Sequence, residues 1–238
     1  ESFDPQSSSR VKLLYIESIE KPQMLLKHAA SLIRKGCRIA AVKAGGSEAG
    51  SRAASSHTGA LSSSDAAVDA LFRKAGIVRA HGREELTTIA SIFMHPPLEG
   101  KNMAIITHAG GPAVMLTDAL SNNGMQIPPI EGEASQKLLE ELFPGSSVAN
   151  PIDFLATGTG EQLGKIIDYC DQSFDHIDGM AVIFGSPGLF PVYEVYDLLD
   201  EKMKQSRKPI YPILPSVVNV KEEIDHFIGK GRINFHDE

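Results

Sequence analysis

Tryptophan is absent from the 238-residue sequence, and cysteine occurs only twice. Cys37 and Cys170 stand in unlike contexts, so they indicate neither a disulfide framework nor a zinc site, and we expect a reducing, cytoplasmic setting. No run of 18 apolar residues is present, so we expect no transmembrane helix. The opening ESFDPQSSSR has no apolar signal core, and we interpret residues 1–10 as a flexible polar lead-in.

A basic surface is also missing. Asp and Glu number 30 against 23 Lys and Arg, giving a net charge of −7, and the cations form no clear cluster. This argues against nucleic acid as the main partner. The hydrophobic and charged fractions, 42% and 22%, are ordinary for a soluble globular protein, and the length suits one large domain or two smaller ones.

What the sequence does contain is an alternation of strand-length apolar runs with amphipathic segments. In the first half we predict strands at 11–17, 38–44 and 76–80, and helices at 22–36, 64–75 and 83–93. In the second half we predict strands at 103–107, 125–128, 179–186, 208–214 and 232–238, and helices at 112–122, 133–143, 160–172, 191–206 and 221–231. The intervening SSVANPIDF (146–154) is predicted as a loop.

This alternation predicts an α/β protein with parallel sheets and right-handed crossovers. We divide it into two flavodoxin-like domains, at 11–95 and 102–238. The segment MHPPLEGK (94–101) has two prolines and a glycine, and we place the linker at 96–101 within it. No short-period repeat is evident.

Candidate ligand-binding residues follow the strands, because open parallel sheets bind ligands beyond the carboxyl ends of their strands. In THAGGPA, the pair Gly110-Gly111 separates a strand from a helix expected to start at Pro112. Free N–H groups in the first turn, including that of Ala113, would favour an anion. The competing interpretation is a tight turn that requires positive φ, and the pattern alone does not decide between them.

The other candidate is His57, in KAGGSEAGSRAASSHTGA (43–60). Five Ala, four Gly and four Ser make up most of this stretch, which we predict to be a long small-residue loop. An imidazole there could serve as a base, metal ligand or nucleophile, or could be only a solvated side chain. The histidines His28, His81 and His95 do not complete a metal set at usual spacing. Glu17, at the end of the first strand, could orient the imidazole or could simply mark where the chain leaves the core.

These segments resemble the nucleoside-diphosphate-forming acyl-CoA synthetases, which are relatives of succinyl-CoA synthetase. SHTGA within the small-residue stretch resembles the phosphohistidine loop of the family, and YIES resembles the segment whose glutamate contacts the phosphohistidine. AIITHAGGPAVMLTDAL and ANPIDF resemble the opening of the second ligase domain and a loop that follows it. The likeness runs in order over about 11–238, with His108 standing where the family often has Asn.

The resemblance implies a reaction and a role for each candidate. Acyl-CoA and phosphate would give an acyl phosphate and CoA, His57 would take the phosphoryl group, and its loop would carry the group to ADP. Glu17 would orient the ring, and the amides of Gly110, Gly111 and Ala113 would hold phosphate. Asn150 and Asp153 would shape the neighbouring loop, although a structural role in the turn is equally open. No metal site is expected in this chain.

The resemblance also implies partners. The family has a CoA-binding Rossmann domain and an ATP-grasp domain, neither of which is in this sequence, and Mg²⁺ would bind with the nucleotide at the ATP-grasp site. The first ligase domain lacks its first strands, so its sheet should expose an edge. We therefore expect an oligomeric or multi-domain assembly that works on acyl-CoA, phosphate and ADP or ATP, with no tightly bound cofactor or activity in this chain alone.

Two alternatives come from other functional classes. One is a catalytically silent module that binds acyl-CoA in a regulatory acetyltransferase fusion, although such a module need not keep His57 and Glu17. The other is a flavodoxin-like flavin binder, although the aromatic residues expected near an isoalloxazine ring are absent from the candidate turns.

Overall fold

The computed structural model describes residues 3–4, 6–58, 64–186, 191–215 and 218–237, and of residues 54–58 it describes the backbone alone. Contacts within the chain divide it into two compact units, Glu1–Met94 and His95–Glu238. Both units are parallel α/β structures, which confirms the predicted fold class. Across the described residues, no helix has the length and apolarity needed to cross a membrane.

The first unit is built on a three-stranded parallel sheet in the order β1-β2-β3. Its strands are β1 (Val11–Ile16), β2 (Arg38–Lys43) and β3 (Val78–Ala80). β2 is the central strand and has the most buried residues, among them Ala40 and Ala41, which are fully buried. The sheet is therefore narrow, and its core depends on the helices that cover it.

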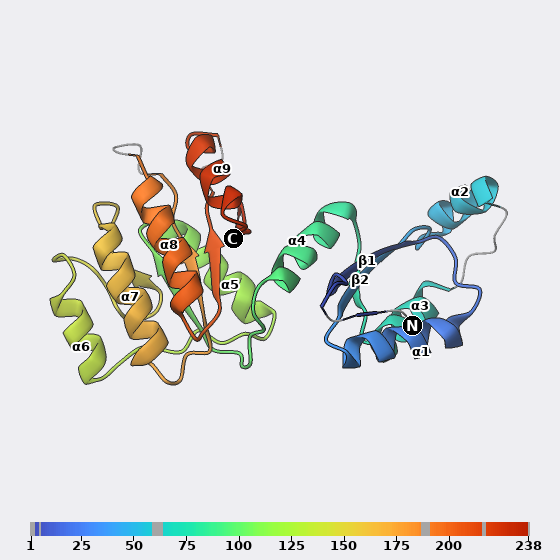
Figure 1. Ribbon diagram of the computed structural model, residues 1–238, viewed down its shortest axis with the longest axis horizontal. Coiled ribbons are helices and arrows are strands. Elements are labelled where there is room, and N and C mark those ends of the chain that lie inside the picture. Colours follow the sequence, from blue (N-terminus) through green and yellow to red (C-terminus); the bar gives the residue numbers. More distant parts are fainter. Residues whose placement is uncertain (1–2, 5, 59–63, 187–190, 216–217, 238) are drawn as a thin grey trace. The chain divides into compact units, whose positions relative to one another are not determined.

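Helices α1 (Pro22–Arg34) and α3 (Asp65–Ala75) pack together and share one apolar cluster with the sheet (Figure 1). Pro22 occupies the first turn of α1, where the missing N–H costs nothing. Gly76 ends α3 in the left-handed conformation, with φ of 74°. Helix α4 (Arg83–Met94) contacts all three strands, and none of its residues is fully buried.

The outer edge of β1 has no neighbouring strand among the described residues. Leu14 and Ile16 join the apolar cluster under α1 and α3. Alternation along the strand sends Leu13 and Tyr15 to the other face. These two side chains are 43% and 67% exposed, so β1 is only half-buried rather than the buried strand its apolar run suggested.

The second unit contains a four-stranded parallel sheet in the order β5-β4-β6-β7. The strands are β4 (Met103–Thr107), β5 (Ile152–Asp153), β6 (Gly179–Ile183) and β7 (Ile210–Ile213). Every residue of β4 and β6 is buried, as in a sheet covered on both faces. β5 lies within the predicted loop 146–154, where it forms a two-residue strand beside the end of β4.

Helices cover both faces of this sheet (Figure 1). Helix α5 (Gly110–Asn122) packs on one face, in a cluster with Met103, Ile105 and Ile183. The helices whose residues line the other face are α6 (Glu133–Glu140), α7 (Gly160–Gln172), α8 (Tyr193–Gln205) and α9 (Lys221–Gly229). A capping box starts α7, in which Thr159 and Gln162 satisfy each other's backbone N–H groups.

Residues 95–102, which precede β4, belong to the second unit and pack within it. His95 is buried between the rings of Tyr211 and Phe235, with centroid distances of 5.2 and 5.6 Å. The hydroxyl of Tyr211 donates to the Pro96 carbonyl at 3.5 Å, and Leu98 joins the α5 cluster. This stretch, which includes the expected linker, is therefore held by side-chain contacts.

Two predicted strands are wrong in the structure. The segment 125–128 contributes one isolated bridge, between Gln126 and Asn102, because Pro128 and Pro129 follow and have no N–H to extend the pairing. The described part of the segment 232–238 likewise contributes a single bridge, between Phe235 and Ile213 on β7. Both lie beside true strands without becoming part of the sheet.

Candidate functional site

The small-residue stretch is not the continuous loop predicted from its composition. Residues Glu48–Thr58 form helix α2. Alanine is the best helix former, and the Ser47 hydroxyl caps the first turn by accepting from the Gly50 N–H at 3.0 Å. Arg52 and Glu48 form an i,i+4 ion pair at 2.7 Å. His57 thus lies on the last turn of a helix, while its side chain and residues 59–63 fall outside the described part.

The carboxyl ends of β1 and β2 lie side by side because Ile16 pairs with Lys43. Glu17 therefore follows β1 next to the start of the segment that leads to α2. Its side chain is partly buried, and no hydrogen bond to its carboxylate is present within the described residues. Lys43 is only 8% exposed, and its Nζ donates to the neighbouring Ala44 carbonyl. The sequence analysis did not single out Lys43. What could have indicated it is its position, since a cation at the last residue of a buried strand is unusual.

A polar cluster that sequence reasoning also missed joins α3 to β3. Arg79 donates to Asp65 at 2.5 Å, and this bond holds the pKa of the Asp65 carboxyl below its usual value. A Cβ on Gly46 would lie 2.8 Å from the same carboxylate, so only glycine fits there without a shift. The turn after β2 is therefore pressed against the first turn of α3. The sequence shows this polar cluster only as an arginine in a short strand, which is too common to indicate a site.

In the second unit, α5 begins earlier than predicted. Ala109 is the N-cap, so Gly110 and Gly111 are the first two helical residues and Pro112 is the third rather than the first. Neither glycine has positive φ, which removes the tight-turn explanation for the pair. A Cβ on Gly111 would meet no heavy atom within 4 Å. The fold does not require glycine at 111, and the open space there fits the approach of a ligand.

Asp153 and Asn150 both lie against β4. Asp153 pairs with Thr107 at the end of β4, and a Cβ on Gly110 would lie 3.5 Å from its Oδ2. Its Oδ1 accepts from the Leu155 N–H at 2.9 Å. Asn150 lies farther back, where its side chain bonds to three backbone groups. Asp153 therefore borders the α5 N-terminus, whereas the Asn150 side chain is fully engaged with the backbone.

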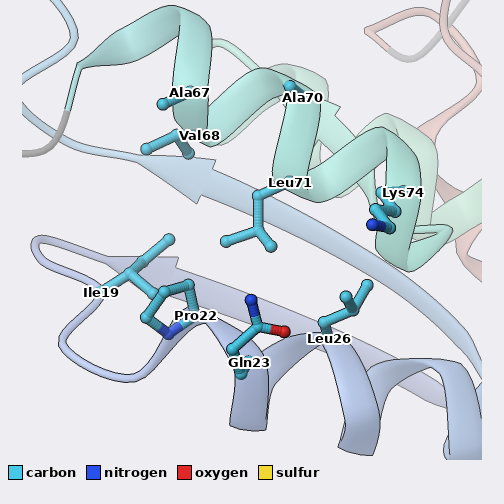
Figure 2. Close-up of a pocket in the computed structure, with 9 residues that line it drawn as sticks. All are labelled: Ile19, Pro22, Gln23, Leu26, Ala67, Val68, Ala70, Leu71 and Lys74. Atoms are coloured by element: carbon cyan, nitrogen blue, oxygen red, sulfur yellow. The ribbon is translucent and has the colours of Figure 1, made fainter.

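A separate groove of about 360 Å³ lies between α1 and α3 (Figure 2). Its walls are mainly apolar, and its polar groups are the amide and the ammonium of two exposed side chains. The apolar walls include Ile19, Leu26, Val68 and Leu71, and the polar groups belong to Gln23 and Lys74. None of the predicted site residues is among those that line it.

The chain is similar to known proteins in sequence and in structure. Residues 1–93 match the model of the succinyl-CoA ligase like flavodoxin domain. The chain is 36% identical over 180 residues to the alpha subunit of acetate–CoA ligase [ADP-forming] II of Pyrococcus furiosus, covering 75% of this chain and 39% of that protein. It is 29% identical over 229 residues to the alpha subunit of the type I enzyme of the same organism, covering 94% of this chain and 49% of that protein.

A solved structure extends the likeness through both units. A dinucleotide forming acetyl-coenzyme A synthetase 1 from Ca. Korarchaeum cryptofilum, in complex with phosphate and ADP, aligns with a TM-score of 0.83 and 25% identity. The alignment covers 97% of this chain and 50% of that one. The matched part of the chain thus spans about a fifth to a half of the length of the relatives it matches. Residues 1–93 thus match a succinyl-CoA ligase like flavodoxin domain, and the chain is similar over most of its length to ADP-forming acetate–CoA ligases.

Proposed function

We propose that this chain is the phosphoryl-relay portion of an ADP-forming acyl-CoA synthetase. The complete enzyme would interconvert acyl-CoA, ADP and phosphate with a carboxylic acid, ATP and CoA. The observation that carries the proposal is the position of α2, which follows β2 and bears His57, while Glu17 ends the adjacent strand. The named relatives support the reaction class, since they are ADP-forming acetate–CoA ligase subunits.

In this mechanism the chain supplies a carrier and a binding surface. Phosphate attacks the thioester carbonyl of acyl-CoA, and the carbon–sulfur bond breaks to release CoA and an acyl phosphate. The imidazole of His57 then takes the phosphoryl group from the acyl phosphate, which releases the acid. Glu17 would accept the other ring N–H and so fix the tautomer that attacks. The phosphoryl group finally passes from His57 to ADP.

The N-terminus of α5 would hold phosphate or the acyl phosphate. Its first amides are not used within the helix, and the helix dipole favours an anion there. Gly110 and Gly111 would supply the contacts, whereas Ala113, predicted with them, is the fourth helical residue, where N–H groups begin to bond within the helix. Asp153 with Asn150 would shape the adjoining loop. We assign the nucleotide and Mg²⁺ to an ATP-grasp domain or subunit and the CoA to a Rossmann domain, both outside this chain.

The alternative is a silent regulatory module that binds acyl-CoA without turnover. The two functions separate in one assay on the full-length protein, with its nucleotide-binding partner if that is a separate chain. Acetyl-CoA, ADP and phosphate should yield ATP and free CoA in equal amounts. Binding of acetyl-CoA with no ATP formed would favour the regulatory module instead.

A further inference from the structure

The second sheet has a topological switch point between β4 and β6. The chain leaves β4 toward β5 on one side, and it leaves β6 toward β7 on the other. In open α/β sheets, ligands bind in the crevice beyond the carboxyl ends of two such strands. The α5 N-terminus, where the proposed function puts phosphate, follows β4 at this switch point.

His108 links the segments that follow the two strands of this switch point. It directly follows β4, and its Nε2 lies 3.0 Å from the carbonyl oxygen of Gly185, two residues beyond the end of β6. A carbonyl can only accept, so Nε2 carries the proton and donates it. Ala109, the N-cap of α5, comes next in the chain. The bond therefore ties the segment after β6 to the segment that starts α5.

Two aromatic rings hold the imidazole in place. Phe184 meets it edge-on with centroids 4.6 Å apart, and Phe154 does so at 6.4 Å. The other ring nitrogen, Nδ1, is buried and makes no hydrogen bond within the described residues. All polar contact of the side chain thus goes through Nε2–H, while its stabilising contact comes from the rings. The two contributions are made by different atoms and can be removed separately.

We propose that His108 is a positioning residue for phosphate, which holds the Gly185 segment at the distance from the α5 N-terminus that phosphate binding needs. This inference rests on the proposed function, since it concerns the phosphate site of that reaction. Asn, with a shorter side chain, carries its amide nitrogen at the place of Nδ1 and cannot reach Gly185 in the same way. Gln carries its amide nitrogen at the place of Nε2 and can.

Three variants of the full-length enzyme separate positioning from packing. His108→Phe keeps the ring contacts with Phe154 and Phe184 and loses the N–H donor. His108→Gln keeps a donor for Gly185 and loses the ring contacts. His108→Asn loses both. The measurements are the KM for phosphate and kcat in ATP synthesis from acetyl-CoA, together with the thermal midpoint of each variant.

We expect His108→Phe to melt near wild type and to raise the phosphate KM about five-fold or more. His108→Gln should melt lower and keep a phosphate KM within about two-fold of wild type. His108→Asn should show both defects. The positioning role is wrong if the phosphate KM follows stability, so that it is normal in His108→Phe and raised in His108→Gln. It is also wrong if no variant changes the phosphate KM.

Labelling with ATP distinguishes this failure from that of the proposed function. Transfer of phosphoryl from ATP to His57 does not require free phosphate, so all three His108 variants should still acquire the label. If they do and their phosphate KM is unchanged, only the role of His108 is refuted. If wild type acquires no label at His57, the proposed function fails, and the positioning role fails with it.

Discussion

The side chain of Asn150 and the backbone of Ile105 are joined by a hydrogen bond of 3.0 Å, from the Ile105 N–H to Oδ1. The Asn150 Nδ2 donates to the carbonyls of Met103 and Pro128, at 2.9 and 2.8 Å. The Asn150 side-chain amide therefore links β4 to the backbone at Pro128 by hydrogen bonds that a neighbouring strand would otherwise make. It satisfies three backbone groups where the prolines prevent normal pairing.

Loss of this amide should destabilise the second unit. We expect Asn150→Ala to lower the free energy of unfolding by about 3 kcal/mol, because three partly buried backbone groups lose their partner. Asn150 also has φ of 73°, which Gly adopts freely. Asn150→Gly should nevertheless fall within about 1 kcal/mol of Asn150→Ala. Urea unfolding measures both, with the exposed Asn123→Ala as control. If Asn150→Gly were as stable as wild type, only the backbone angle at this position would matter.

The stability of the second unit should depend on pH through His95. Burial lowers the pKa of the imidazole to about 4, while the unfolded chain titrates near 6.5. The folded state thus binds the proton less well than the unfolded chain. The free energy of unfolding is therefore highest above pH 6.5 and falls as the pH drops from 6.5 to 4. Below pH 4 it is lower by on the order of 3 kcal/mol. His95→Phe should flatten this part of the curve, and the exposed His176→Gln should not. Equal slopes in all three proteins would contradict the assignment.

Gly111 tests whether the α5 N-terminus is kept open for a ligand. Its Cβ position is empty and its φ is not positive, so Gly111→Ala should keep or slightly raise the thermal midpoint. A methyl group at the phosphate-binding amides should raise the phosphate KM of the full-length enzyme about ten-fold. Gly229→Ala, whose Cβ position is also open, is the matched control in α9. Unchanged kinetics for Gly111→Ala would place phosphate elsewhere.

The helical state of α2 depends in part on its cap. Ser47→Ala removes the acceptor for the Gly50 N–H, so the helix should open more easily by about 1 kcal/mol. Amide hydrogen exchange in α2 should then run about five-fold faster, while α3 keeps its wild-type rates. Ser64→Ala is the control, because Ser64 precedes α3 without making a side-chain cap bond. Matching effects in both variants would mean that Ser47 does not act as a cap.

The regular elements could be read from the sequence, since long apolar repeats and end signals such as Pro22 and Gly76 agree with the tertiary structure. The errors arose where composition and conformation diverge. The small-residue composition of 43–60 predicts a loop, but alanine with a serine cap forms α2. The apolar run MQIP predicts a strand, but the prolines stop the pairing after one bridge.

The site was less predictable because its geometry depends on contacts between distant segments. That Gly110 and Gly111 lie inside the helix, without positive φ, could not be known before the N-cap was located at Ala109. The bonds of Asn150 to Met103 and Pro128 involve backbone groups, which leave no trace in residue identity. The role proposed for His57 rests on the resemblance of its segment to a known loop, since periodicity carries no information about a nucleophile.

The phosphorylation state of His57 tests the central claim most directly. The full-length enzyme, together with its nucleotide-binding partner if that is a separate chain, is incubated with γ-³²P-ATP, and the acid-labile, base-stable label on this chain is counted and mapped. The account predicts about one label per active site on wild type, located at His57, and none on His57→Ala. Undiminished acid-labile label on His57→Ala would contradict it.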